Sequence, residues 1–129
     1  MNEFVFELES EDSLIRIDAE IGESDFALAL DTGATHTIID LAIMLMNGYR
    51  LGDVIRTVEF ETAKGNVSAY IFKVKTLKIL GQTRRDVEVA SYDFIGNNVI
   101  LDIDGVVGLD FFKGMELNIN FRKCTITLK

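Results

Sequence analysis

Hydrophobic and polar residues alternate with a period of two along much of the chain. In residues 15–21, apolar side chains alternate with Arg16, Asp18 and Glu20, which is typical of a strand that buries one face. Residues 26–30 are apolar throughout, as in a strand buried on both faces, although this composition is also compatible with a helix. Further strands are predicted where residues alternate or are rich in β-branched and aromatic side chains: 4–8, 57–62, 67–80, 86–90 and 99–101.

Two short helices are expected between these strands. Asp40 can cap a helix over residues 41–46, and Asn47-Gly48 can end it in a left-handed conformation. This helix is expected to be short and largely buried. A second helical turn is predicted over residues 109–113, closed by Gly114.

Two hairpins are also predicted. Residues 63–66 separate two strand-like segments and indicate a hairpin turn. Near the end of the chain, residues 117–121 face residues 124–128 across an Arg122-Lys123 turn. Together these patterns predict an all-β fold with one or two short helices.

The size of the chain fits one domain over residues 1–129. It has 129 residues, of which 48% are hydrophobic and 26% are charged, so it can bury a substantial core and lacks the composition of a disordered chain. Because it has no proline, turns depend on its 10 glycines together with asparagine and aspartate.

The net charge and the low cysteine count indicate which binding partners are disfavoured and which cellular compartment is expected. A formal charge of −8 repels nucleic-acid phosphates and anionic lipid surfaces. With one cysteine and one histidine, the chain cannot form an intramolecular disulfide, and structural zinc would need several carboxylates. The first residues are acidic where a signal peptide would be basic. We expect a cytoplasmic protein that binds neither nucleic acid nor membrane.

Three short motifs follow one another along the chain in an order that indicates a catalytic site. The first, Asp31-Thr32-Gly33-Ala34, follows the apolar strand at residues 26–30, where a rigid element would hold the carboxylate. The second is the hairpin turn Ala63-Lys64-Gly65-Asn66, and the third is Val106-Val107-Gly108 just before the second short helix. This combination resembles the single-lobe, retropepsin-like branch of the aspartic peptidases, in which a catalytic loop, a flap and a second motif follow one another.

The resemblance implies a closed acid-protease-type β-barrel with a flap hairpin, and it implies a role for each matching residue. Asp31 would be catalytic, and the loop would be supported by Thr32, Gly33 and Ala34. The flap and substrate-binding residues would be Ala63, Lys64, Gly65, Asn66, Val106 and Val107. Gly108 would allow tight packing behind the catalytic loop. No metal or other cofactor is implied.

Peptide hydrolysis at such a site needs two carboxylates beside one water molecule, one ionised and one protonated. The chain contains only one Asp-Thr-Gly. A complete pair therefore requires Asp31 from two chains around a twofold axis, which predicts a homodimer acting on extended polypeptides. The alternatives are a noncatalytic peptide-binding or dimerisation module with the same fold, and an unrelated acidic β-barrel with an accidental Asp-Thr-Gly.

Four other residues are interpreted without a catalytic role. His36 is expected to be a surface or loop histidine, since no serine or cysteine completes a triad with it. Cys124 is expected to be a small core residue. Asp102 and Asp104 alternate with apolar neighbours and are expected to face solvent rather than bind calcium.

Overall fold

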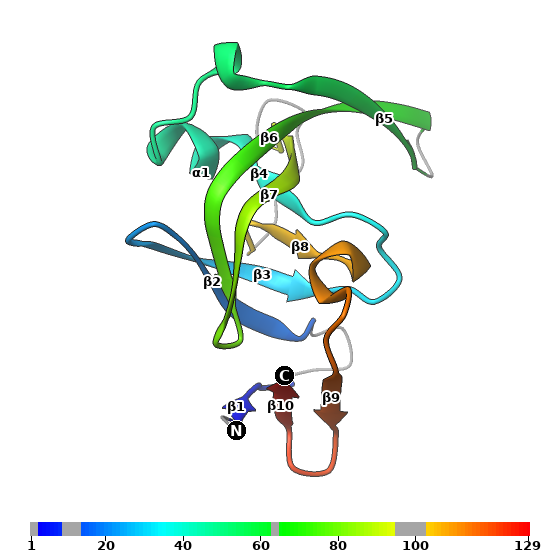
Figure 1. Ribbon diagram of the computed structural model, residues 1–129. Helices are drawn as coiled ribbons and strands as arrows, with labels where there is room; N and C mark the ends of the chain where they lie inside the picture. The colour runs from blue at the N-terminus through cyan, green and yellow to red at the C-terminus, as the bar shows by residue number, and fades with distance from the viewer. Residues whose placement is uncertain (1–2, 9–13, 63–64, 95–102) are drawn as a thin grey trace.

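The main sheet of the computed structural model closes on itself, as Figure 1 shows. The structure describes residues 3–8, 14–62, 65–94 and 103–129. In order around the barrel lie β2 (Arg16–Ile21), β3 (Ser24–Leu30), β8 (Gly105–Val107), β4 (Ile38–Asp40), β7 (Gln82–Tyr92) and β6 (Gly65–Ile79). Strand β6 pairs back onto β2 through Ala19 and Glu20, which closes the ring. The predicted closed β-barrel is confirmed.

The flap hairpin extends from this barrel. Strand β5 (Arg56–Thr62) pairs with β6 along its whole length, and the pairing ends at Thr62 and Gly65. Gly65 and Asn66, which were predicted as turn residues, belong to β6. Residues 63 and 64 lie outside the described residues.

A separate three-stranded sheet joins the two ends of the chain. Its order is β1 (Phe4–Val5), β10 (Thr125–Leu128) and β9 (Leu117–Asn120). The predicted terminal hairpin is confirmed, whereas the strand expected over residues 4–8 is shortened to its first two residues. Strand β1 thus pairs with β10 of its own chain.

The helix α1 (Leu41–Met46) has the predicted boundaries. The Asp40 side chain accepts a hydrogen bond from the Ala42 amide at 3.4 Å, and Gly48 follows with a φ of +87°. The expectation that this helix is largely buried is wrong, because Met44 is its one buried residue and Met46 is 78% exposed. Within the described residues, no helix is long and apolar enough to cross a membrane.

Two short 3-10 helices complete the described chain: η1 (Leu51–Asp53) and η2 (Leu109–Phe112). The second lies where a helical turn was predicted. Arg84 fixes its end by donating hydrogen bonds to the carbonyl oxygens of Phe111 and Lys113. The strand predicted over residues 99–101 lies outside the described residues.

The core fills the barrel and continues under the terminal sheet. Residues 26–30 lie in a strand rather than a helix, and Leu28 is fully buried there. Phe72 and Phe111 are buried in the same cluster, as is Ile126 of the terminal sheet. This packing makes β3 a firm support for the residues that follow it.

Candidate active site

Asp31 begins the loop that follows β3. Strand β3 runs parallel to β8, with Leu30 beside Val107, and the Asp31 amide donates a hydrogen bond to the Val107 carbonyl oxygen at 3.0 Å. The chain then turns, with the Ala34 amide donating to the Asp31 carbonyl oxygen at 3.1 Å. Asp31 is exposed at the end of this buried strand. Its backbone is fixed while its carboxylate remains accessible to water and ligands.

The residues after Asp31 shape the surface around its carboxylate. The Gly33 amide donates to Asp31 Oδ1 at 2.9 Å, and a side chain at position 33 would begin 3.2 Å from that oxygen. Thr32 and Gly33 are exposed, and Ala34 is half-buried. An exposed, oriented carboxylate of this kind can take a proton from water, which is the work of a general base.

The loop is attached to η2 through its backbone. The Leu109 amide donates to the Ala34 carbonyl oxygen at 2.8 Å, and the Asp110 amide donates to the Thr35 carbonyl oxygen at 3.3 Å. Between them, Gly108 lies so close that an added Cβ would be 2.7 Å from the Ala34 oxygen and 2.6 Å from the His36 oxygen. Only glycine fits at this contact without moving the loop.

A second attachment involves two side chains that the sequence analysis did not single out. Thr37 is 2% exposed, and its hydroxyl donates to Asp110 Oδ1 at 2.7 Å. The same hydroxyl oxygen accepts a hydrogen bond from the Gly108 amide at 3.2 Å, and the Thr37 amide donates to the Asp110 carboxylate at 3.0 Å. Since Thr37 and Asp110 are 73 residues apart, no local pattern points to this pair.

The two valines of the second motif have different environments. Val106 is half-buried on β8 between Ala29 of β3 and Ile38 of β4. Val107 is 0% exposed and belongs to the main core. The interpretation of Val107 as a substrate-pocket residue therefore requires correction, because its side chain packs in the core beneath the loop.

The flap hairpin contacts the loop of its own chain. The rings of His36 and Phe60 meet edge to face, with centroids 5.2 Å apart and an interplanar angle of 70°. Phe60, on β5, also packs on a small apolar cluster centred on Ala69, Ile71 and Ala90. His36 is exposed in the loop, as expected, but it also forms the link between loop and flap.

The predicted flap residues are only partly described. Gly65 and Asn66 are exposed at the start of β6. Ala63 and Lys64 lie outside the described residues. The structure thus places part of the predicted flap at the free end of the β5–β6 hairpin.

An ion pair lies at the base of the flap. Arg56 Nη2 is 2.6 Å from Glu88 Oε1, and both side chains are about half exposed. The hydrogen bond from Arg56 lowers the pKa of Glu88 below its ordinary value, and the positive charge of Lys73 adds to this effect. This pair joins the first residue of β5 to β7.

Asp104 does not face solvent as a free strand carboxylate, so that prediction is wrong. It is half-buried, and its Oδ2 accepts a hydrogen bond from the Ala27 amide at 3.0 Å. The Asp104 amide in turn donates to the Ala27 carbonyl oxygen at 2.8 Å. Asp102 lies outside the described residues. Cys124 is half-buried against the core.

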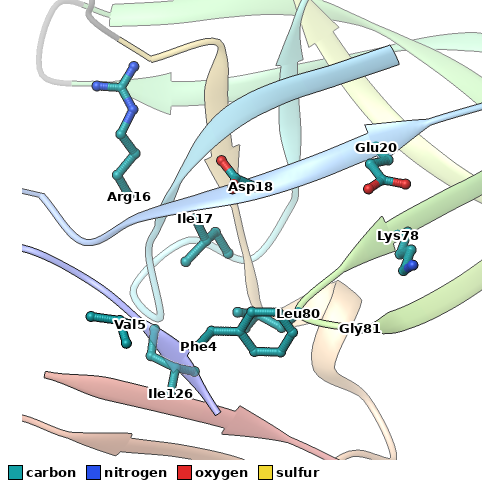
Figure 2. Close-up of a pocket in the computed structure, with 10 residues that line it drawn as sticks. All are labelled: Phe4, Val5, Arg16, Ile17, Asp18, Glu20, Lys78, Leu80, Gly81 and Ile126. Carbon is teal, nitrogen blue, oxygen red and sulfur yellow. The ribbon is translucent and has the colours of Figure 1, made fainter. Parts of the chain in front are cut away.

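The structure also contains a pocket of about 370 Å³ in a different place. Figure 2 shows it between β1 and β2, with Phe4, Leu80 and Ile126 on its apolar side and Asp18 near its charged rim. None of the predicted site residues lines it. Within the described residues, no cluster of three histidine, cysteine or acidic side chains is placed to hold a metal ion.

Comparisons with known proteins agree with this geometry. Residues 17–111 match the model of a family described as aspartyl protease. The chain is also similar in structure to a retropepsin-like aspartic protease from Rickettsia conorii, with a TM-score of 0.73 and 18% sequence identity over 98% of this chain and 90% of that one. At this identity, the structural likeness supports the fold. No curated protein matches the chain in sequence.

Proposed function

Because the chain belongs to the aspartyl protease family, we propose that it is an aspartic endopeptidase that hydrolyses peptide bonds of extended polypeptides. The observation that carries this proposal is Asp31, an exposed carboxylate on a loop whose backbone is fixed by β8 and η2. Rigid support and solvent access are the two conditions that a carboxylate needs to activate water.

The reaction needs a second carboxylate, which this chain alone does not supply. Its sequence contains one Asp-Thr-Gly, and a twofold axis next to Asp31 would bring a second copy of that residue to the site. At about 3 Å separation and an effective dielectric constant of about 20, two unit charges repel by roughly 5 kcal/mol. The pair therefore retains one proton over a wide range of pH.

The shared proton gives the two carboxylates different roles. The ionised Asp31 accepts a proton from water, and the oxygen of that water forms a bond to the peptide carbonyl carbon. The protonated Asp31 donates its proton to the carbonyl oxygen. When the tetrahedral intermediate collapses, the C–N bond breaks and the leaving nitrogen takes the proton that the first Asp31 accepted from water. One hydroxyl of the intermediate returns a proton to the other Asp31, which leaves a carboxylic acid, an amine and a pair that again holds one proton.

The surrounding residues orient the substrate in this proposal. Thr32, Gly33 and Ala34 would border the carboxylate pair, and Val106 would contribute an apolar wall. The described flap residues Gly65 and Asn66 would cover an extended peptide from the opposite side through backbone hydrogen bonds.

The decisive experiment replaces the proposed catalytic carboxylate. Asp31→Asn should lower the rate of peptide cleavage by about a thousandfold or more, because a neutral amide cannot act as the base. Asp25→Asn is a matched control, since Asp25 is an exposed aspartate at the opposite end of β3. Both variants should unfold at the same denaturant concentration as the wild type. Cleavage by Asp31→Asn at the wild-type rate would refute the assignment.

The pH dependence of the rate tests the shared proton separately. One ionised and one protonated carboxylate are present together only at intermediate pH, so the rate should follow a bell-shaped curve with its maximum at mildly acidic pH. A rate that rises steadily from about pH 4 to about pH 9 would contradict a pair that shares one proton.

A further inference from the structure

Arg84, on β7, directs its guanidinium group at backbone oxygens of η2 and of the residue after it. Its Nε and Nη2 atoms donate hydrogen bonds to the Phe111 carbonyl oxygen at 2.9 and 2.7 Å, and Nη2 also donates to the Lys113 carbonyl oxygen. The centre of the Phe111 ring is 5.7 Å from the guanidinium carbon. The chain has 21 acidic residues, yet Arg84 takes part in neither ion pair found among the described residues. Its contacts therefore hold a segment of backbone in place rather than pair two charges.

These contacts attach the end of η2 to the barrel. The last carbonyl groups of a helix have no partner within the helix, and the forked guanidinium group supplies donors to two carbonyl groups here. Arg84 is half-buried and Phe111 is 1% exposed, so the hydrogen bonds to the Phe111 oxygen are partly shielded from water. Arg84 itself pairs with Leu77 of β6. The end of η2 is thus fixed to a strand of the barrel.

The other end of η2 holds the loop that carries Asp31. Asp110 accepts a hydrogen bond from the Thr37 hydroxyl at 2.7 Å, and the amides of the first two residues of η2 donate to carbonyl oxygens of the loop. Phe111, which accepts from Arg84, directly follows Asp110 in the chain. Figure 1 shows η2 as the orange coil beside this loop. A shift at the Arg84 end of η2 therefore reaches the loop within one helical turn.

We propose that Arg84 is a positioning residue, which sets the spacing between the two Asp31 carboxylates by fixing η2. This inference rests on the proposed function, because the carboxylate pair belongs to that site. Arg84 acts on the pair through η2 and the loop, and it has no part in the proton transfers themselves. The support of the catalytic loop thus extends to β7.

The spacing of the pair determines how far apart its two ionisations lie. At a separation of about 3 Å and an effective dielectric constant of about 20, the repulsion corresponds to about four pK units. Two carboxylates at this distance are already in contact, so any loosening of their support increases the mean separation. An increase of about 1 Å would bring the two ionisations closer by about one pK unit. A narrower bell-shaped rate profile is therefore the signature of a displaced loop.

The test compares two arginines that are neighbours on β7. Arg84→Met removes the guanidinium group but keeps an unbranched side chain. Arg85→Met is the matched control, because Arg85 is exposed next to Arg84 and its loss changes the charge of the chain by the same amount. Arg84→Lys keeps the positive charge but not the fork. For each variant, kcat and KM for a peptide substrate are measured from about pH 3 to about pH 8, and urea denaturation measures stability.

A second measurement does not depend on activity. Amide hydrogen exchange over residues 31–37 reports how firmly the loop is held, and the Ala34 and Thr37 amides both donate hydrogen bonds there. It is followed by mass spectrometry in the Asp31→Asn protein, which avoids self-cleavage. Exchange in this segment should be about tenfold faster when Arg84→Met is added than when Arg85→Met is added.

The expected kinetic result separates positioning from binding. Arg84→Met should lower kcat by about tenfold or more and change KM by less than about threefold, because it displaces the carboxylates rather than the surface that binds the peptide. The two apparent pKa values of its rate profile should approach each other by about one unit. Arg84→Lys should have an intermediate effect. Arg85→Met should stay within about twofold of the wild type in kcat and keep its rate profile.

Two results would overturn this role for Arg84. Wild-type kcat and an unshifted rate profile in Arg84→Met, with or without a loss of stability, would make Arg84 a purely structural residue. Equal losses of kcat in Arg84→Met and Arg85→Met would assign the effect to the charge of the chain. If Arg84→Met does not fold, Arg84→Lys decides, since wild-type kcat and an unshifted profile in that variant would overturn the role equally.

Failure of the proposed function gives a different result. A wild type without Asp31-dependent cleavage would overturn the peptidase assignment and the positioning role within it, and hydrogen exchange would show separately whether Arg84 holds the loop. Asp31-dependent cleavage by the wild type, with no change of kcat, rate profile or hydrogen exchange in the Arg84 variants, would keep the proposed function and remove the positioning role.

Discussion

The loop that carries Asp31 and the flap hairpin differ in how they are held. Residues 31–37 are hydrogen-bonded to β8 and η2 at several points, including the bond from buried Thr37 to half-buried Asp110. Strand β5 of the flap pairs along one side with β6, and its link to the loop is the ring contact between Phe60 and His36. A carboxylate that activates water must be held in place, whereas a segment that covers a polypeptide must let it enter and leave.

This difference predicts two classes of variant. Changes beneath the loop should lower stability and kcat together, because they displace the Asp31 backbone. Changes in the flap contact should act mainly on KM and leave most of the stability intact.

Gly108→Ala should have the largest effect. Its Cβ would lie 2.6 Å from the His36 carbonyl oxygen, so the loop must move to accommodate it. We expect a loss of about 3 kcal/mol in the free energy of unfolding, measured by urea denaturation, and a marked loss of kcat. Gly52→Ala is the control, because a side chain there would meet no atom within 4 Å. Similar stability of the two variants would argue against a tightly packed loop.

Thr37→Val should have the next largest effect. Valine keeps the shape of threonine but removes the hydroxyl that donates to Asp110 and accepts from the Gly108 amide. The buried Gly108 amide then loses this acceptor, and the Asp110 carboxylate keeps only the hydrogen bonds from the Thr37 amide. This loss should cost about 2 kcal/mol and lower kcat more than it raises KM. Thr37→Ser, which restores the hydroxyl, should recover most of the loss. Failure of serine to do so would assign the effect to packing alone.

Phe60→Ala should mainly affect substrate binding. It removes the ring that contacts His36 and part of the apolar cluster beneath the flap. We expect KM for a peptide to rise several-fold, with a stability loss of about 1 kcal/mol. Phe60→Leu keeps apolar packing without the ring. It should therefore separate the contribution of the ring contact with His36 from the contribution of apolar packing. A loss of kcat as large as that of Thr37→Val would remove the contrast between loop and flap.

Glu88→Gln should have the smallest effect. Its lowered pKa means that the ionised side chain stabilises the folded state above the ordinary glutamate pKa, and that this contribution is lost as pH falls through the folded-state value. The wild type should therefore exceed Glu88→Gln in stability slightly at neutral pH, and the difference should disappear in acid and at high salt. Thermal unfolding at several pH values measures it. A difference that grows in acid would be inconsistent with the Arg56–Glu88 pair.

Local patterns predicted most of the secondary structure. Alternation over residues 15–21 and the capped segment 41–46 correspond closely to β2 and α1. The retropepsin-like resemblance, and with it the closed barrel, is confirmed by the family match and by the structural likeness. These features depend on neighbouring residues and on the order of motifs, both of which can be read along the chain.

Burial and partners across the chain were predicted less well. Val107 and Asp104 have the same local pattern as residues that face a cleft or solvent, yet one packs in the core and the other accepts a hydrogen bond from the Ala27 amide. The exposure of Met46 depends likewise on which elements cover α1. Alternation shows that a strand has two faces, but it does not show what packs on each face.

The amino-acid sequence by itself determined the order of the three motifs along the chain and the end of α1 just before Asn47-Gly48, since both follow from residue type and spacing. Only the tertiary structure decided that Thr37 meets Asp110 and that Phe60 of the flap contacts His36. These contacts join residues distant along the chain, and closure of the barrel is what brings them within reach of one another.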